Sequence, residues 1–341
     1  MLNITQVSNI MKNLSQWFNQ QWYQSESKPR ILCGLAKLYH MGQRLDKAWK
    51  LGKRPSRPPL PVIVIGNISV GGTGKTPLVM ALYDYLSQLG IRVGIVTRGY
   101  RGQCTTFPYL VKEDDSVTWI GDEAAMLWKK TKAPIVLARK RNQGLELLAQ
   151  HDLCDVILSD DGLQHYAMPR SLEIVVIDGE RGFGNQQLLP LGPLREPISR
   201  LQSIDCIVIN GAASEKLTQQ LQTIDKPLFQ MQLEPGAIYP LHQDTVELTK
   251  PIAAFAGIGH PKRFFTTLTQ QGHEFTAYQF DDHHHYQLKD FEIRETCIIM
   301  TEKDAIKCHQ IKSKPIFVLP VKAILEEKFW QQLLNAVSKS K

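Results

Sequence analysis

The sequence predicts an α/β fold with a parallel sheet domain, a second, smaller α/β domain and an N-terminal amphipathic helical arm. Short apolar strands alternate with helical patterns between residues 62 and 209, as in a parallel sheet covered by helices. A second strand-rich set begins at residue 252, and a basic stretch precedes residue 58. The 341 residues leave room for two cores. We expect the arm at 1–57, the sheet domain at 58–227, a connector at 228–250 and the smaller domain at 251–341.

The arm contains two predicted helices, each with its apolar residues on one face. In the first they are Ile10, Leu14, Trp17, Phe18 and Trp22. In the second, which follows Pro29, they are Ile31, Leu32, Leu35, Leu38 and Tyr39. Residues 28–57 also carry nine Lys or Arg against one acid, an excess larger than the +7 of the whole chain.

Apolar faces flanked by basic residues are typical of helices that lie in a membrane interface. We therefore expect the arm to contact an anionic membrane surface. Two ordinary packed helices with a solvated charged side are the alternative. We expect no nucleic acid, because the aromatic residues lie on the apolar face rather than among the basic residues.

The segment 61–77 predicts a strand, a glycine-rich loop and the start of a helix. The strand is Val62–Ile65, and the helical pattern runs to Leu89, before Gly90. The expected phosphate-binding loop consists of Ser69, Val70, Gly71, Gly72, Thr73, Gly74, Lys75 and Thr76. Its backbone N–H groups and the helix dipole would hold an anion. Lys75 would reach the phosphates, and the Thr76 hydroxyl would hold Mg²⁺.

The loop departs from the usual phosphate-loop pattern at its first position, and a second interpretation of it is possible. The usual pattern begins with Gly, but Ser69 occupies that position, so Gly71 and Gly72 supply the flexibility. A glycine-rich turn without a ligand is the alternative interpretation. The loop, with the strand before it and the helix after it, predicts a P-loop NTPase-type domain.

Further strands and helices continue the sheet domain along the chain. The expected strands are residues 92–97, 135–138, 156–159, 174–177 and 206–209, and the expected helices are 121–130 and 141–151. Ligands of parallel sheets bind at the carboxyl ends of the strands, so polar residues there are candidates.

Three acidic motifs are such candidates. Asp160 and Asp161 end a strand, and two adjacent carboxylates favour a magnesium site, although loop capping is the alternative. Asp122 opens a helix, where a cap and a catalytic role are both possible interpretations. The proline-rich loop 190–197 presents Arg195 and Glu196, which could meet a phosphate and a metal or form a surface ion pair.

The predicted second domain contains a histidine run. Hairpin-like stretches at 228–233 and 237–241 form the connector, and the expected strands are 252–256, 275–280, 297–300 and 316–319. His283, His284 and His285 are consecutive, so their side chains diverge and rarely share one metal ion. We favour Asp282 and His283 as a carboxylate–imidazole pair, with surface histidines as the alternative. Thr301-Glu-Lys-Asp304 has its lysine one place late for guanine recognition.

The cysteine and hydropathy patterns indicate in which cellular environment the protein folds. Six scattered cysteines without a Cys-x-x-Cys pair argue against a disulfide framework and a cysteine-based zinc site, and they suit a reducing cytosol. We expect no cleaved signal peptide, since no charged segment precedes an apolar run. No apolar stretch reaches the roughly 18 residues of a spanning helix.

Seven motifs together resemble the tetraacyldisaccharide 4′-kinases, the lipid A 4′-kinases of Gram-negative bacteria. They are Gly66-Asn-Ile-Ser-Val-Gly-Gly-Thr-Gly-Lys-Thr-Pro77, Arg98-Gly-Tyr, Gly121-Asp-Glu, Asp160-Asp-Gly-Leu-Gln-His165, Leu189-Pro-Leu-Gly-Pro-Leu-Arg-Glu-Pro197, Phe280-Asp-Asp-His283 and Thr301-Glu-Lys-Asp304. They occur in the family's order over residues 62–304. Ser69 also agrees with the family's own loop pattern.

The resemblance implies a membrane-associated lipid kinase at the cytoplasmic face of the inner membrane. It would transfer the γ-phosphoryl group of ATP to the 4′-hydroxyl of a tetraacyldisaccharide 1-phosphate, the lipid A precursor, with Mg²⁺ and no obligate protein partner. Asp122 matches the family's catalytic aspartate, and Asp282 and His283 match the Asp-His pair near it. Asp160, Asp161 and Glu196 match the acidic positions with which the family handles magnesium. Arg195 matches a residue near the transferred phosphate.

Two other functions remain open at this level. The first is a nucleotide-driven metallochaperone or switch that uses His283–His285 as metal ligands. The second is a soluble P-loop kinase of a small metabolite, with a merely structural arm. Acyl-chain preference and oligomeric state leave no signal in the sequence.

Overall fold

The computed structural model describes residues 17–18, 20–23, 29–55, 58–242 and 247–338. The chain divides into two compact units. The first unit comprises Met1–Lys75, Val156–Gln232 and Leu325–Lys341, and the second comprises Thr76–Asp155 and Leu233–Ile324. Each unit thus combines ranges that are distant in sequence, whereas the boundaries expected from the sequence follow the chain. Those boundaries remain predictions.

The first unit is built on a parallel sheet. Its strands are β1 (Val62–Gly66), β5 (Val156–Asp160), β6 (Leu172–Asp178), β7 (Cys206–Asn210) and β8 (Leu228–Pro235). They are ordered β8-β7-β6-β1-β5, and each pairs with its neighbours in parallel. Strands β1, β5, β6 and β7 are buried throughout, as their Val- and Ile-rich runs predict. The parallel-sheet prediction is confirmed.

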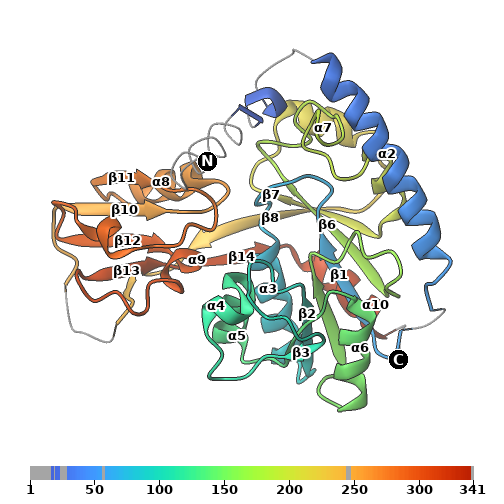
Figure 1. Ribbon diagram of the computed structural model, residues 1–341, viewed down its shortest axis with the longest axis horizontal. Coiled ribbons are helices and arrows are strands. Elements are labelled where there is room, and N and C mark those ends of the chain that lie inside the picture. The colour runs from blue at the N-terminus through green and yellow to red at the C-terminus, as the bar shows by residue number, and fades with distance from the viewer. Residues whose placement is uncertain (1–16, 19, 24–28, 56–57, 243–246, 339–341) are drawn as a thin grey trace, which may run out of the picture. The chain divides into compact units, whose positions relative to one another are not determined.

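The helices of this unit whose bounds the structure describes are α2 (Arg30–Leu51), the 3₁₀ helix η1 (Ile198–Ser203), α7 (Glu215–Leu221) and α10 (Glu327–Ser338). Helix α2 is the long blue helix of Figure 1. Tyr39 Oη and Gln43 Nε2 of α2 both donate to the Arg195 carbonyl, at 3.0 and 2.8 Å. Trp22 Nε1 donates to the Pro190 carbonyl at 3.0 Å. The predicted arm positions Ile10 and Leu14 lie outside the described residues.

The second unit begins with the helix that follows the glycine loop. Its first part contains α3 (Lys75–Gln88) from Thr76 onward, β2 (Val93–Thr97), β3 (Tyr109–Leu110), α4 (Val117–Ile120), α5 (Asp122–Thr131), β4 (Ile135–Leu137) and α6 (Arg141–Gln150). β2 and β4 are parallel, and β3 is antiparallel to β4. On α3, the residues buried are Leu78, Val79, Ala81, Leu82 and Leu86, which is the face that the helical spacing predicts.

The second unit also contains a five-stranded sheet (Figure 1). Its strands are β9 (Tyr239–Pro240), β10 (Ile252–Ala256), β11 (Phe275–Gln279), β12 (Cys297–Thr301) and β13 (Ile316–Leu319), ordered β11-β10-β12-β13-β9. All pairings are parallel except that of β9 with β13. The other elements here are α8 (Pro261–Gln270), η2 (Leu288–Phe291), α9 (Glu302–Ala305) and β14 (Val321–Leu325).

Alternate residues of this sheet build two apolar layers. Phe264 and Leu268 of α8 pack with Ala254 and Ile299 on one face. Phe255 lies in the layer on the other face, where its ring contacts those of Tyr278, Phe280, Tyr286 and Phe291. Side chains of a strand alternate between faces, so one short apolar strand serves both layers. The predicted α/β character of this part is confirmed.

The two strands of the expected connector pair with different sheets rather than with each other. The stretches at 228–233 and 237–241 look like the two arms of a hairpin in the sequence, but they do not pair with each other. β8 pairs in parallel with β7, whereas β9 pairs antiparallel with β13 of the five-stranded sheet. Strand propensity and turn residues do not specify a partner, because long-range packing decides it.

Two environmental predictions can also be compared with the structure. Among the described residues, no helix combines the length and hydropathy needed to cross a bilayer. The six cysteines are free thiols, and five of them are buried.

Candidate active site

The glycine loop of the first unit follows β1 and leads into α3. Gly71 and Gly74 have φ angles of +99° and +94°, a conformation that favours glycine. A Cβ atom on Gly74 would also collide with the Asn210 amide, whose Nδ2 donates to the Thr73 carbonyl at 3.1 Å. The loop backbone is therefore held in its turn by Asn210, the last residue of β7.

Lys75 lies next to an acidic and a basic partner. Its Nζ is 3.4 Å from Asp161 Oδ1, and Arg195 Nη1 is 3.1 Å from Asp161 Oδ2. Burial would raise the pKa of Asp161, but the charges of Lys75 and Arg195 outweigh it and hold this pKa well below its usual range. Asp161 also has a φ of 48°, which is uncommon for a residue with a side chain and concentrates at functional positions.

The proline-rich loop is attached to the glycine loop by backbone contacts. Arg195 N donates to the Ile68 carbonyl at 2.7 Å, and Val70 N donates to the Pro193 carbonyl at 2.8 Å. Ser69 forms an antiparallel bridge with Leu194. These bonds fix the start of the glycine loop next to Arg195.

Glu196 is buried with its carboxylate fully engaged. Its oxygens accept hydrogen bonds from Gln164 Nε2 at 2.8 Å and Tyr166 Oη at 2.7 Å. Arg200 Nε is 3.3 Å from Glu196 Oε2. Burial, then the Glu196 charge and hydrogen bond, raise the pKa of Tyr166, so this phenol stays protonated and donating.

The predicted metal residues are arranged as follows. Asp160 and Asp161 stand at the carboxyl end of β5, and Asp160 is almost completely buried. Thr76 follows Lys75 in the first turn of α3. Glu196 is already bonded as above, so a metal ion would have to share its oxygens. No group of three His, Cys, Asp or Glu side chains with metal-binding geometry occurs in the described part of the chain.

Asp122 and His283 form a close pair in the second unit. His283 Nδ1 is 2.6 Å from Asp122 Oδ2, and both side chains are buried. The N-cap of α5 is Gly121 rather than Asp122, so the capping interpretation of Asp122 is wrong. Burial would raise the pKa of Asp122, but the hydrogen bond from His283 and the charges of Lys303 and Lys307 leave it lowered. Asp122 is thus an ionised carboxylate at neutral pH.

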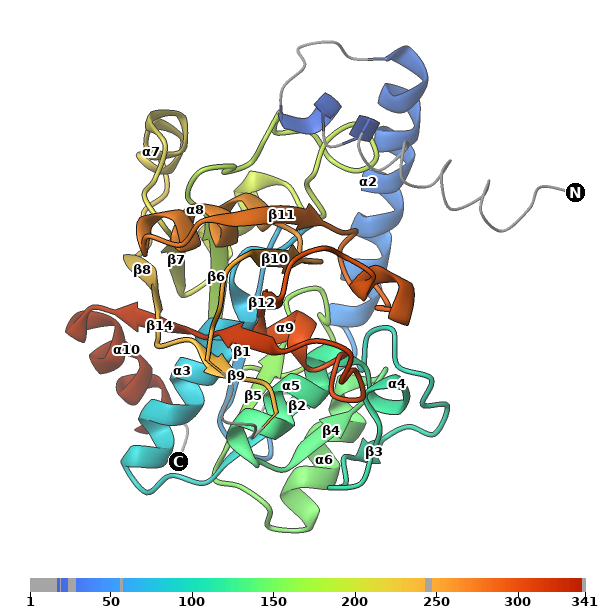
Figure 2. The ribbon, with the colours of Figure 1, turned by 90° about the vertical axis from the view of Figure 1, so that its left-hand side faces the viewer.

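Lys303 of α9 determines the hydrogen-bonding direction in this pair. Its Nζ lies 3.1 Å from His283 Nε2 and 3.5 Å from both Asp282 Oδ1 and Glu123 Oε1. An ammonium group only donates, so Nε2 of His283 accepts and Nδ1 carries the proton given to Asp122. Figures 1 and 2 show α9 beside α5 in this unit.

The remaining histidines point to different partners. His284 Nε2 is 3.0 Å from Asp290 Oδ2, and His285 is exposed. His283, with a φ of 62°, directs its ring to Asp122 instead. Asp282 lies 3.8 Å from His283 Nε2, so Asp122 and not Asp282 is the carboxylate that orients this imidazole.

Sequence reasoning therefore identified two groups of residues and missed some of their partners. The glycine loop, Lys75, Asp161 and Arg195 come together in the first unit, and Asp122, Asp282 and His283 in the second. The partners without a predicted role are Gln164, Tyr166 and Lys303. Gln164 and Lys303 lie within motifs already singled out, which was the available signal, whereas Tyr166 lies just beyond one.

Comparison with known proteins identifies the family. A family model described as tetraacyldisaccharide-1-P 4′-kinase (LpxK) matches residues 29–338. The tetraacyldisaccharide 4′-kinase of Legionella pneumophila (strain Corby) is 41% identical over 319 residues, which cover 93% of this chain and 96% of that protein. The protein of the same name from Shewanella sp. (strain MR-4) is 40% identical over 330 residues, 94% of each chain.

A solved structure agrees with these relatives. The crystal structure of LpxK from Aquifex aeolicus in complex with ATP matches with a TM-score of 0.74 and 27% identity, over 90% of this chain and 98% of that one. The predicted resemblance is confirmed, and the chain belongs to the tetraacyldisaccharide-1-P 4′-kinase family.

Proposed function

We propose that this protein transfers the γ-phosphoryl group of ATP to the 4′-hydroxyl of a tetraacyldisaccharide 1-phosphate, a step of lipid A biosynthesis. The observation that carries this proposal is family membership combined with an intact glycine loop. The relatives are named for this kinase activity, and the Aquifex aeolicus structure contains ATP. Both alternatives, the metallochaperone and the small-metabolite kinase, lack a comparable observation.

The triphosphate binds at the glycine loop of the first unit. Residues 69–76 supply backbone N–H groups and the Lys75 ammonium, while Arg195 adds a second cation. Ser69 and Val70 are held through the proline-rich loop, which fixes the start of the glycine loop. Transfers of this kind depend mainly on positioning and electrostatic stabilisation.

Asp122 accepts the proton of the attacking hydroxyl. Its lowered pKa keeps it ionised, and the hydrogen bond from His283 fixes the orientation of its carboxylate. Lys303 in turn holds the imidazole, and Asp282 lies 3.5 Å from the Lys303 ammonium group. His283 is thus a positioning partner for the base.

The acidic residues at β5 fit a magnesium ion. Asp160 and Asp161 offer the hard oxygen ligands that Mg²⁺ prefers, and the Thr76 hydroxyl is the usual ligand of a phosphate loop. Glu196 contributes to this magnesium site indirectly, through its hydrogen bonds with Gln164 and Tyr166. The ion would neutralise charge on the triphosphate during transfer.

The arm keeps the protein at the cytoplasmic face of the inner membrane. Helix α2 leaves Ile31, Leu35, Leu38, Leu45 and Trp49 exposed, with Leu38 at 61% and Trp49 at 63%. Their spacing places them on one side of the helix, roughly a quarter to a third of a turn from Tyr39 and Gln43, which hold Arg195. We call these five residues the outward stripe. An exposed apolar stripe on a basic helix is suited to an interface with lipid.

The direct test is incubation of the purified protein with γ-labelled ATP, Mg²⁺ and a tetraacyldisaccharide 1-phosphate in detergent. We expect label in the lipid fraction at the 4′ position. ATP hydrolysis without a labelled lipid product would contradict the proposed function, and label on a water-soluble sugar instead would favour the small-metabolite kinase.

A further inference from the structure

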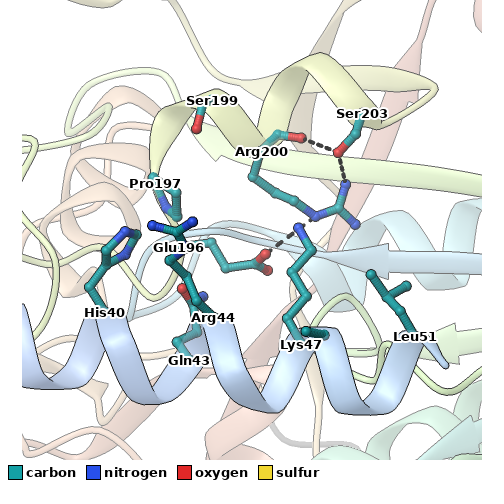
Figure 3. A pocket seen from close by; sticks show the side chains of 11 residues that line it. His40, Gln43, Arg44, Lys47, Leu51, Glu196, Pro197, Ser199, Arg200 and Ser203 are labelled. Carbon is teal, nitrogen blue, oxygen red and sulfur yellow. Dashed lines mark hydrogen bonds and ion pairs between the residues drawn. The ribbon is translucent and has the colours of Figure 1, made fainter. Parts of the chain in front are cut away.

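A cavity of about 440 Å³ lies between α2 and the segment that contains η1, within the first unit (Figure 3). Its volume is in the range of small-molecule sites. His40, Arg44 and Lys47 line it from α2, and Glu196, Arg200 and Ser203 line it from the other side. Neither the glycine loop nor Asp122 contributes to this lining, so the phosphate and proton-transfer roles do not account for it.

The cavity has an uncompensated positive charge. Arg44 and Lys47 lie one turn apart and point toward Glu196 and η1 (Figure 3). No ion pair with an acid is found for either of them in the described residues. The Lys47 ammonium lies over the Tyr166 ring, 5.2 Å from its centroid. Burial, together with the nearby charge of Arg200, lowers the pKa of Lys47.

The acidic residue of the cavity does not cancel this charge. Glu196 is neutralised by Arg200, and its oxygens accept from Gln164 and Tyr166. Arg200 is in turn bonded to Glu173 at 2.6 Å, and Arg170 pairs with the same Glu173 carboxylate, so two acids and two arginines form a closed buried network. The two helix cations are left to attract an anion from outside the protein.

The cavity is connected to the glycine loop through Arg195 and Glu196, which are adjacent in the sequence. Glu196 follows Arg195, whose guanidinium holds Asp161 and whose carbonyl accepts from Tyr39 and Gln43 of α2. A ligand seated here would share one helix and one loop with the phosphate-binding residues. The outward stripe lies on the opposite side of the same helix.

We propose that this cavity binds the 1-phosphate of the lipid substrate, with Arg44 and Lys47 as the residues that recognise it. The inference rests on the proposed function. The 1-phosphate stands at the opposite end of the disaccharide from the 4′-hydroxyl, so it needs a subsite separate from the nucleotide phosphates. Lys47 is half-buried and Arg44 is exposed. A phosphate monoester forms stronger, charge-assisted hydrogen bonds with these two cations than a neutral hydroxyl group does.

The test compares two substrates, the tetraacyldisaccharide 1-phosphate and the same disaccharide with a free 1-hydroxyl, in one detergent. The measured quantity is the ratio of kcat/KM for the two. For the unaltered protein we expect a ratio of about ten or more, the range of a charge-assisted contact. In the double variant Arg44→Ala/Lys47→Ala the ratio should fall at least about tenfold, mainly through KM for the phosphorylated substrate.

The control Lys37→Ala/Lys53→Ala removes the same charge from exposed positions outside the cavity and should leave the ratio unchanged. Thermal melting checks folding, and Lys47→Gln, which keeps a long side chain over Tyr166, replaces the double variant if that one does not melt cooperatively. A ratio near one for the unaltered protein would overturn the proposal.

Other outcomes separate the competing explanations. Equal loss on both substrates, with weaker binding to micelles doped with anionic phospholipid, would assign the cavity to a membrane headgroup and contradict the substrate assignment. An unchanged ratio in the double variant would also refute it. Transfer to neither substrate by the unaltered protein would instead refute the proposed kinase function.

Discussion

At Asp122, burial and hydrogen bonding act in opposite directions. A buried carboxylate without partners would hold its proton near neutral pH, but the His283 N–H and the nearby lysines favour the ionised form. Lys303, by accepting no hydrogen bond itself, leaves His283 only one arrangement of its proton. Contacts from three different sequence motifs therefore keep Asp122 ionised and able to accept a proton.

We expect Asp122→Asn to lower kcat about a hundredfold or more, because general-base catalysis contributes at that level. ATP affinity should change little, since the glycine loop is unaltered. Steady-state kinetics and a nucleotide-binding assay measure the two effects. Asp114→Asn, at an exposed position, is the matched control and should retain full activity. Equal losses in kcat and ATP binding would argue against the base role.

His283→Ala should change the pH dependence. Removing the imidazole deletes the main influence that lowers the Asp122 pKa, and burial then raises it. Asp122 would be protonated at higher pH than before, so the acid limb of the kcat profile should move to higher pH. A profile that keeps its acid limb while activity falls uniformly would assign His283 a different role.

At the level of elements, sequence periodicity located the strands well but not their partners. The runs at 252–256 and 316–319 were predicted with their observed bounds, because Val, Ile and Phe in short apolar runs have few other stable arrangements. The pairing of β8 and β9 was not predictable, since a strand's own residues do not encode its neighbour. The Glu196 network was hidden for the same reason, as Tyr166 reaches it only in the folded chain.

Helix α2 allows a prediction about its outward stripe. Leu38→Glu should weaken binding to anionic vesicles roughly tenfold or more, because a buried leucine contributes about 1.5–3 kcal/mol. Stability should be nearly unchanged, since Leu38 is exposed in the free protein. Vesicle co-sedimentation measures the binding. Leu89→Glu is the control, because Leu89 is a similarly exposed leucine outside the arm; an equal loss there would remove the case for a specific membrane face.

At the level of the whole molecule, the two compact units carry different parts of the proposed chemistry. The first holds the glycine loop with Lys75, and the second holds Asp122 with His283. The sequence could predict that two cores exist, from length and from two sets of strands. It could not predict that each unit collects distant ranges, because chain order says nothing about which segments share a core.

ATP should therefore stabilise the protein through one unit. At a hundred times its dissociation constant, a ligand adds about 2.7 kcal/mol to the free energy of unfolding. We expect a rise of several degrees in the melting temperature by differential scanning calorimetry, confined to the transition of the unit with the glycine loop. Lys75→Ala should abolish the rise, and a persistent shift in that variant would place the nucleotide elsewhere.

The contact between Lys75 and Asp161 gives the loop lysine a built-in counter-ion. A triphosphate that enters the loop exchanges one anion for another, so its apparent affinity reflects a competition. Small inorganic anions such as sulfate enter the same exchange. The choice of buffer salt will consequently set the nucleotide concentration at which this kinase works in vitro.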